Sequence, residues 1–208
     1  MSAGGTQREA STFTGVILAG GQGRRLNLDK PLLELTGRPL VEDMLEKLAA
    51  LFPDVILVVD RGESPLGSYA GERVLVVPDL VPGKGPLGGI YTALEATRSE
   101  FIFVMACDMP FACVELARLM MERAPGHQAV VPCQGQLIEP LFAIYRRDIL
   151  PIVAARVARG DLKIHELLDA LDVIYIEEEV KACDPSGLCF FNINTEHDLA
   201  KARRLLKP

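Results

Sequence analysis

The sequence predicts an α/β protein built on a largely parallel, doubly wound sheet. Short apolar segments alternate with amphipathic segments from residue 14 to residue 132. The apolar runs at 55–59 and 100–106 lack the polar alternation of half-exposed strands, as expected for strands covered on both faces. Repeating strand–helix units of this kind favour a parallel sheet with helices on both sides.

The elements of this first part follow in a regular order. We expect strands at 14–19, 55–59, 73–77, 100–106 and 129–132. Helices are expected at 39–52, 87–97 and 111–123. The first helix has Pro39 in its first turn and an apolar stripe formed by Val41, Met44, Leu45, Leu48 and Phe52. The third helix places Leu116, Leu119 and Met120 inward.

The remaining part is less regular. A strand at 136–145 contains Pro140, which indicates an edge, a bulge or a bend. Helices are expected at 146–158 and 163–171, and strands at 173–176 and 188–193. The acidic run at 177–179 is typical of a solvated face. Thr195 can cap a last helix whose buried side carries Leu199, Ala202 and Leu206.

Composition limits the possible functions. The chain has 208 residues, 49% of them hydrophobic, and a net charge of -6, which counts against a nucleic-acid-binding surface. No apolar run is long enough to cross a bilayer, and residues 1–13 lack the apolar centre of a signal peptide. We therefore expect a disordered leader at 1–13, a single domain at 14–208 and a cytoplasmic protein that does not associate with membranes. The five cysteines form no C-x-x-C pair, which favours reduced thiols.

The most informative stretch follows the first strand. It runs Leu18-Ala19-Gly20-Gly21-Gln22-Gly23-Arg24-Arg25 and continues to Asp29-Lys30. Glycines let backbone N–H groups approach an anion, and Arg24, Arg25 and Lys30 can neutralise phosphate charge. The dinucleotide fingerprint fails because Leu26 stands at its third glycine, and the Walker A pattern fails because Gly85 follows Gly83-Lys84. The alternative is a glycine-rich turn with solvated arginines.

Further candidate residues lie at the carboxyl ends of the predicted strands. Leu18, Ala19, Gly20, Asp60, Asp79 and Asp108 all occupy such positions. Ligands of doubly wound sheets bind outside these ends, so we expect one shared crevice. The loop at 82–89 offers Gly85, Gly88 and Gly89 for close approach of a base or ribose.

Two motifs keep alternatives open. Asp108 is well placed for Mg²⁺, yet Pro110 two residues later could open the next helix, and Asp108 could instead be its cap. Asn192 and Asn194 flank Ile193 and would share one side of the predicted strand. They could contact a second substrate, or serve only in a turn and cap.

Together these motifs resemble the molybdenum cofactor guanylyltransferases, the MobA family of the nucleotidyltransferase superfamily. The resemblance rests on the glycine–arginine loop, Asp29-Lys30, and Pro78-Asp79 with Gly85-Pro86-Leu87-Gly88-Gly89. It also rests on Cys107-Asp108-Met109-Pro110, Glu139-Pro140-Leu141 and Asn192-Ile193-Asn194-Thr195. The family implies a three-layer α/β/α sandwich of the nucleotide-diphospho-sugar transferase type. A Rossmann-like nucleotide-binding half would span 14–110 and a pterin-binding half 111–208.

The resemblance also implies an activity and roles for residues. The family transfers GMP from GTP to molybdenum-bearing molybdopterin with Mg²⁺, releasing pyrophosphate. Lys30, Arg25 and Asp108 would be catalytic, with Asp108 binding Mg²⁺ and Lys30 the phosphates. The nucleotide would contact Leu18, Ala19, Gly20, Gly21, Lys30, Asp60, Asp79, Gly85 and Asp108. Asn192 and Asn194 would contact the pterin, and molybdoenzyme chaperones or apo-enzymes would be partners.

Other functions would require different residues at these motifs. The pterin cytidylyltransferases have sequences similar to Leu-Ala-Ala-Gly and Pro-Lys at two places. This chain has Leu18-Ala19-Gly20-Gly21 and Asp29-Lys30 there, which fits the guanylyltransferases better. A sugar-phosphate nucleotidyltransferase would share the fold and the first loop, but the short chain and the segment at 192–195 count against it. A non-catalytic GTP-binding escort of the cofactor could dispense with Lys30 and Asp108. The chain departs from the guanylyltransferase pattern at Asp60, where the family often has Asn, and at Leu26-Asn27, where it usually has Met-Gly.

Overall fold

The computed structural model describes residues 11–20, 30–35, 37–61 and 64–206. Gly21, Arg24, Arg25 and Asp29 of the glycine–arginine loop lie outside the described residues, as do residues 1–10 of the expected leader. Phe13 already belongs to the first strand.

Eight strands of the described chain form one sheet in the order β3-β2-β1-β4-β7-β5-β6, with β8 paired to β5. The parallel part contains β1 (Phe13–Leu18), β2 (Val55–Val59), β3 (Val74–Pro78) and β4 (Phe101–Ala106). The other part contains β5 (Ala129–Gln134), β6 (Leu137–Ile138), β7 (Phe142–Arg146) and β8 (Val173–Ile176). There β7 runs antiparallel to both β4 and β5, whereas β8 is parallel to β5.

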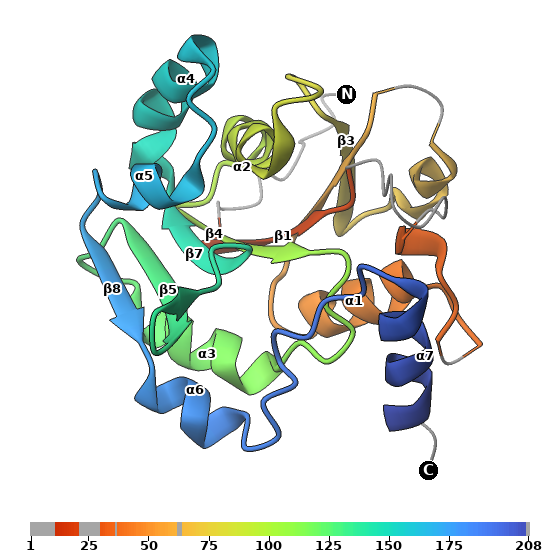
Figure 1. Cartoon of the computed structure of the whole chain (residues 1–208). Coiled ribbons are helices and arrows are strands. Elements are labelled where there is room, and N and C mark those ends of the chain that lie inside the picture. The colour runs from red at the N-terminus through yellow and green to blue at the C-terminus, as the bar shows by residue number, and fades with distance from the viewer. Residues whose placement is uncertain (1–10, 21–29, 36, 62–63, 207–208) are drawn as a thin grey trace, which may run out of the picture.

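Helices cover both faces of this sheet (Figure 1). On one face lie α2 (Gly85–Ala96), α4 (Leu150–Arg159) and α5 (Ile164–Leu168). On the other lie α1 (Leu40–Ala49), α3 (Val114–Arg123), α6 (Glu178–Cys183) and α7 (Glu196–Leu205). The expected three-layer α/β/α sandwich is confirmed. Within the described ranges, none of these helices has the length and apolar character needed to cross a membrane.

The central strand β1 shows how one strand supplies two cores. Ile17 packs with Val41 and Met44 of α1 on one face. Val16 and Leu18 pack with residues of α2, such as Ile90, on the opposite face. Side chains of a strand alternate between faces, so a continuous apolar run buries both sides at once. The strand ends are thereby held in a fixed arrangement from which loops can present polar groups.

The predicted strand at 188–193 is wrong. The segment is a turn followed by irregular backbone. The Asp184 carboxylate accepts hydrogen bonds from the backbone N–H groups of Leu188 (3.1 Å) and Cys189 (2.7 Å). Side chains that bond nearby backbone groups in this way compete with strand pairing. The argument that Asn192 and Asn194 share one side of a strand therefore fails.

Other differences are local. The expected strand at 136–145 divides into β6 and β7 around Glu139–Leu141, so Pro140 marks a break. Helix α6 was not predicted, because the acidic run at its start was interpreted as a solvated surface. Leu206 is 38% exposed rather than buried, and it follows the last residue of α7. Thr195 caps α7 as expected, through a reciprocal capping box with Asp198.

Candidate active site

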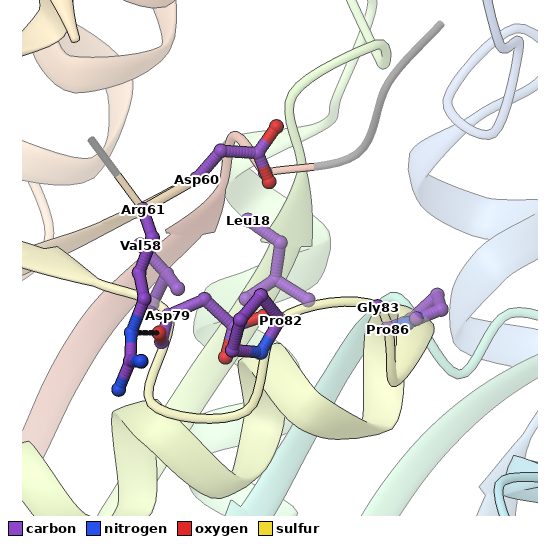
Figure 2. Close-up of a pocket in the computed structure, with 11 residues that line it drawn as sticks. Leu18, Val58, Asp60, Arg61, Asp79, Pro82, Gly83 and Pro86 are labelled. Atoms are coloured by element: carbon purple, nitrogen blue, oxygen red, sulfur yellow. Dashed lines mark hydrogen bonds between the residues drawn. The ribbon is translucent and has the colours of Figure 1, made fainter. Parts of the chain in front are cut away.

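A cleft of about 420 Å³ opens at the carboxyl ends of β1, β2 and β3 (Figure 2). It is lined by Leu18, Gly20, Val58, Asp60, Arg61, Asp79, Pro82, Gly83, Gly85, Pro86 and Gly89. Leu18, Val58 and Asp60 belong to the strand ends, Pro82 and Gly83 come from the loop before α2, and Pro86 lies in the first turn of α2 (Figure 2). Gly83 and Gly85 have φ angles of 81° and 63°, which residues with a Cβ rarely adopt. The loop can therefore turn tightly beside the cleft.

Asp79 is buried where β3 meets this loop. Its Oδ1 accepts hydrogen bonds from Thr92 Oγ1 (2.9 Å) and the Val81 N–H (3.0 Å). The same Thr92 hydroxyl accepts from the Leu80 N–H at 3.0 Å. Arg61 donates to the carbonyl of Asp79 at 3.2 Å, as the dashed line in Figure 2 shows. These bonds fix both the carboxylate and its loop at the edge of the cleft.

Two glycines allow close packing around the cleft. A Cβ placed on Gly20 would lie 2.9 Å from Oδ1 of Asp60, closer than real contacts allow. A Cβ on Gly89 would lie 3.0 Å from Leu18 Cδ2. Gly88 instead faces Val81 and Lys84 and does not line the cleft. Gly85 and Gly89 therefore line the cleft, whereas Gly88 serves the packing of α2.

A second group of polar side chains lies at the end of β4. The Lys30 ammonium donates to Asp108 Oδ2 and to Asn194 Oδ1, both at 2.8 Å. Asp108 does not cap a helix, because α3 begins only at Val114. This group does not line the cleft, but it is close to it. The Cys107 N–H bonds the Leu18 carbonyl at 3.2 Å, joining the ends of β4 and β1.

The oxygen atoms around Lys30 fit a divalent cation. Oδ1 of Asp108 is buried and has no hydrogen-bond partner among the described residues. The ammonium occupies a position between oxygens of Asp108 and Asn194, as a bound cation would. Nowhere in the described ranges do three His, Cys, Asp or Glu side chains converge on a metal site. Magnesium commonly takes only one or two carboxylates and completes its shell with phosphates and water, so this donor set suits it.

The pKa values of two titratable groups near Asp108 are raised. Burial raises the pKa of the Cys107 thiol to about 12, and the Asp108 charge acts in the same direction. Cys107 is thus a buried packing residue whose environment disfavours the thiolate. Burial also raises the pKa of Glu139 above its usual range, with a further contribution from Asp108. Glu139 thus faces the electrostatic field of Asp108 from the break between β6 and β7.

The structure places most of the predicted site residues in these two neighbouring groups. Leu18, Gly20, Asp60, Asp79 and Gly85 line the cleft, and Lys30, Asp108 and Asn194 form the second group. Ala19 pairs its N–H with the Val58 carbonyl and does not line the cleft. Asn192 donates to the Phe190 carbonyl, and among the described residues it is Asn194 that accepts from Lys30. Gly21 and Arg25 lie outside the described residues.

Three polar residues with clear positions were missed. Arg61 directly follows Asp60 at a strand end, so its place in the sequence could have drawn attention to it. Glu139 belongs to a recognised motif but had no assigned role. Thr92 lies inside an apolar helix, and nothing in the local sequence distinguishes it from a packing residue.

Comparisons with known proteins point to one family. A family model described as a MobA-like NTP transferase domain matches residues 15–174. A protein of Pelotomaculum thermopropionicum named "Probable molybdenum cofactor guanylyltransferase" is 40% identical over 191 residues, 91% of either chain. The molybdenum cofactor guanylyltransferase of Vibrio cholerae is 34% identical, covering 93% of this chain and 92% of its own. The crystal structure of molybdopterin-guanine dinucleotide biosynthesis protein A from Archaeoglobus fulgidus superposes with a TM-score of 0.80 and 30% identity, covering 92% of this chain and 97% of that one.

Proposed function

This chain belongs to the MobA-like NTP transferase family, and on that premise we propose that it transfers GMP from GTP to molybdopterin bearing molybdenum. The products are the guanine dinucleotide form of the cofactor and pyrophosphate. The observation that carries the proposal is the Lys30–Asp108–Asn194 group beside a cleft edged by Asp79. The names of the relatives support the choice of substrates.

The cleft is proposed to hold the nucleoside of GTP. Guanine presents adjacent N–H donors at N1 and the 2-amino group, whereas cytosine has acceptors at N3 and O2 and a donor only at its 4-amino group. A carboxylate accepts hydrogen bonds and therefore suits guanine. Asp79 keeps one oxygen bonded to Thr92 and Val81, so its other oxygen is the one proposed to meet the base. A base without matching donors would leave this buried carboxylate poorly paired.

The triphosphate is proposed to extend from the cleft toward Lys30. Asp108 and Asn194 would hold Mg²⁺, with the unpartnered Oδ1 of Asp108 as the first ligand. When bound, Mg²⁺ supplies positive charge at the phosphates. The Lys30 ammonium offsets phosphate charge once it turns from the carboxylate to the nucleotide. Arg25 is proposed to add to this on the strength of the family resemblance.

The reaction requires little proton transfer from the protein. A terminal phosphate oxygen of molybdopterin forms a bond to the α-phosphorus of GTP, while the bond from that phosphorus to the pyrophosphate oxygen breaks. The attacking phosphate is ionised at neutral pH, so no general base is needed. Lys30 and the residues of the cleft act by positioning and charge compensation. Molybdopterin is proposed to approach from the side of the site on which β7 lies. Residues 111–208 are proposed to form its binding surface there.

Pyrophosphate release tests the proposal. Purified protein is incubated with Mg²⁺, molybdopterin and each of the four common nucleoside triphosphates in turn. We expect release with GTP only, and only when molybdopterin is present. Release with CTP alone would overturn the assignment of guanine. Absence of release with every nucleotide, under conditions in which the Vibrio cholerae relative is active, would overturn the proposed activity itself.

A further inference from the structure

Lys47 has a placement that the proposed reaction does not explain. It lies in the last turn of α1, on the face that packs near the segment after β4. Its ammonium donates to the backbone carbonyl of Pro110 at 2.7 Å. Burial lowers the pKa of Lys47 below its ordinary value, while the charge of Asp43 acts in the opposite direction. A partly desolvated lysine is costly unless its ammonium makes a useful bond.

Pro110 belongs to the turn that carries Asp108. This turn has no helix or strand of its own, since β4 ends at Ala106 and α3 begins at Val114. The ends of the turn are tied by hydrogen bonds from the Cys107 N–H to Leu18 and from the Cys113 N–H to Cys189, and two of its carbonyls accept hydrogen bonds from other segments. The Ile193 N–H donates to the Asp108 carbonyl at 2.9 Å, and Lys47 donates to the Pro110 carbonyl. Met109, the residue between them, is 1% exposed.

We propose that Lys47 is a positioning residue for Asp108. The two carbonyls that are held from outside flank Met109, so together they fix the orientation of the turn. That orientation sets the direction in which the Asp108 carboxylate leaves the backbone toward Lys30 and Asn194. Among the described residues, Lys47 forms no hydrogen bond or ion pair with the side chain of Asp108, Lys30 or Asn194. It therefore acts through the backbone. The inference rests on the proposed role of Asp108 as metal ligand.

The positive charge of Lys47 is part of this role. A hydrogen bond from a charged donor is roughly twice as strong as a neutral one. The titratable groups that act on the ammonium are Asp43 from α1 and the thiols of Cys113 and Cys189. Asp43 favours the charged form, and burial opposes it. A methionine of similar length would keep the packing of the stem but could not bond Pro110.

Loss of this bond should leave the fold intact. Lys47 and Pro110 both line a cavity of about 520 Å³ between α1 and the start of α3. Water can therefore reach the Pro110 carbonyl once the ammonium is removed. The apolar core of α1 is formed by other residues, among them Val41, Met44 and Leu48. The expected defect is thus in the turn and not in the stability of the whole domain.

The test compares Lys47→Met with Lys47→Arg and with Lys163→Met. Lys163 is an exposed lysine paired with Glu166 and serves as the matched control for loss of a charge. In Lys47→Met we expect kcat to fall roughly 10- to 100-fold, the scale of small misplacements at a catalytic group. The KM for GTP should stay within about threefold, because Pro110 does not line the nucleotide cleft. Lys47→Arg should recover most of the activity, and Lys163→Met should match the wild type.

A second readout does not depend on turnover. Binding of Mn²⁺ in the presence of GTP, followed by electron paramagnetic resonance, should weaken about tenfold in Lys47→Met while its melting temperature stays near that of Lys163→Met. Unchanged Mn²⁺ binding together with unchanged kcat would overturn the role of Lys47. A parallel loss of stability and of GTP binding would also overturn it, since that pattern belongs to a structural residue. An inactive wild-type protein would instead count against the proposed function, and the Mn²⁺ measurement would still test Lys47.

Discussion

The ammonium of Lys30 lies 2.8 Å from Oδ2 of Asp108, across 78 positions of sequence. The side chains of the two residues are only 16% and 17% exposed, so their interaction is weakly screened by solvent. Oδ1 of the same carboxylate has no partner among the described residues. The pair thus combines a positive charge with an unused ligand atom, which suits phosphoryl chemistry with a divalent cation.

Replacement of Lys30 by methionine should reduce GMP transfer by at least about 100-fold. The methionine side chain is similar in length to that of Lys30, but it leaves the negative charges of the phosphates and of Asp108 uncompensated. Steady-state kinetics of pyrophosphate release measures the effect, and isothermal titration measures GTP affinity. Lys181→Met, a loss of charge on the exposed surface of α6, is the control. Wild-type kcat in Lys30→Met would remove Lys30 from the mechanism.

Gly20→Ala should weaken GTP binding by roughly tenfold, equivalent to about 1.4 kcal/mol. The new Cβ would lie 2.9 Å from Asp60 Oδ1 and would displace that side chain from its position in the cleft. The melting temperature should change little, because the displaced atom ends a side chain. Gly67→Ala is the control, since a Cβ there meets nothing within 4 Å. Equal GTP affinity in the two variants would show that the cleft tolerates a larger residue at position 20.

Thr92→Val should impair both stability and nucleotide selection. The substitution removes the donor to Asp79 Oδ1 and the acceptor for the Leu80 N–H, at a side chain that is 0% exposed. An unsatisfied buried group costs about 1–3 kcal/mol. Thermal unfolding should register this loss, and GTP affinity should fall because the Asp79 carboxylate is less firmly held. Thr92→Ser, which keeps the hydroxyl, should bind GTP almost normally. If the Thr92→Val and Thr92→Ser variants bind GTP equally well, the hydrogen bonds of the hydroxyl do not position Asp79.

The parallel part of the fold could be predicted from the sequence because its signals are local. Continuous apolar runs such as 55–59 mark buried strands, and polar residues directly after them mark strand ends. The rule that parallel strands end at one edge then brings Leu18, Asp60 and Asp79 together without any structure. The cleft confirms that grouping and includes Gly20, but the single crevice expected for all the strand-end residues is wrong for Ala19 and Asp108, which do not line it.

The rest depends on contacts between distant segments. Asn194 meets Lys30 across 164 positions, and no periodic pattern encodes that distance. The expected strand at 188–193 failed because Asp184 bonds the backbone that a neighbouring strand would have bonded. Thr92 and Lys47 have polar atoms whose partners are backbone or side-chain atoms of other elements. Their roles become visible only when those elements are placed side by side.

Glu139→Gln should make the protein more stable at neutral pH. The pKa of Glu139 is raised in the folded state, chiefly by burial and then by Asp108. A raised carboxyl pKa means that folding favours the protonated form, so ionisation above the ordinary pKa of about 4.3 destabilises the fold. Glutamine cannot ionise, and we expect a melting temperature about 2 °C higher at pH 7, with the difference lost near pH 4.

The comparison is made without divalent metal, and Glu178→Gln on the exposed start of α6 is the control. In Asp108→Asn the pKa of Glu139 should move back toward its ordinary value, which a carbon-detected NMR titration of the carboxyl groups can follow. A stabilisation of Glu139→Gln that persists at pH 4 would indicate a packing effect and contradict the electrostatic explanation.

Asp108 is the residue on which the proposed transfer of GMP from GTP depends most. The most direct test follows label from GTP marked at its α-phosphate into the pterin product, in wild type and in Asp108→Asn, with Mg²⁺ and molybdopterin present. We predict labelled product and equimolar pyrophosphate in the wild type, and a loss of at least about 100-fold in Asp108→Asn with a near-normal melting temperature. Equal labelling by the two proteins would remove Asp108 from the reaction, and labelling from CTP in place of GTP would overturn the assignment of guanine.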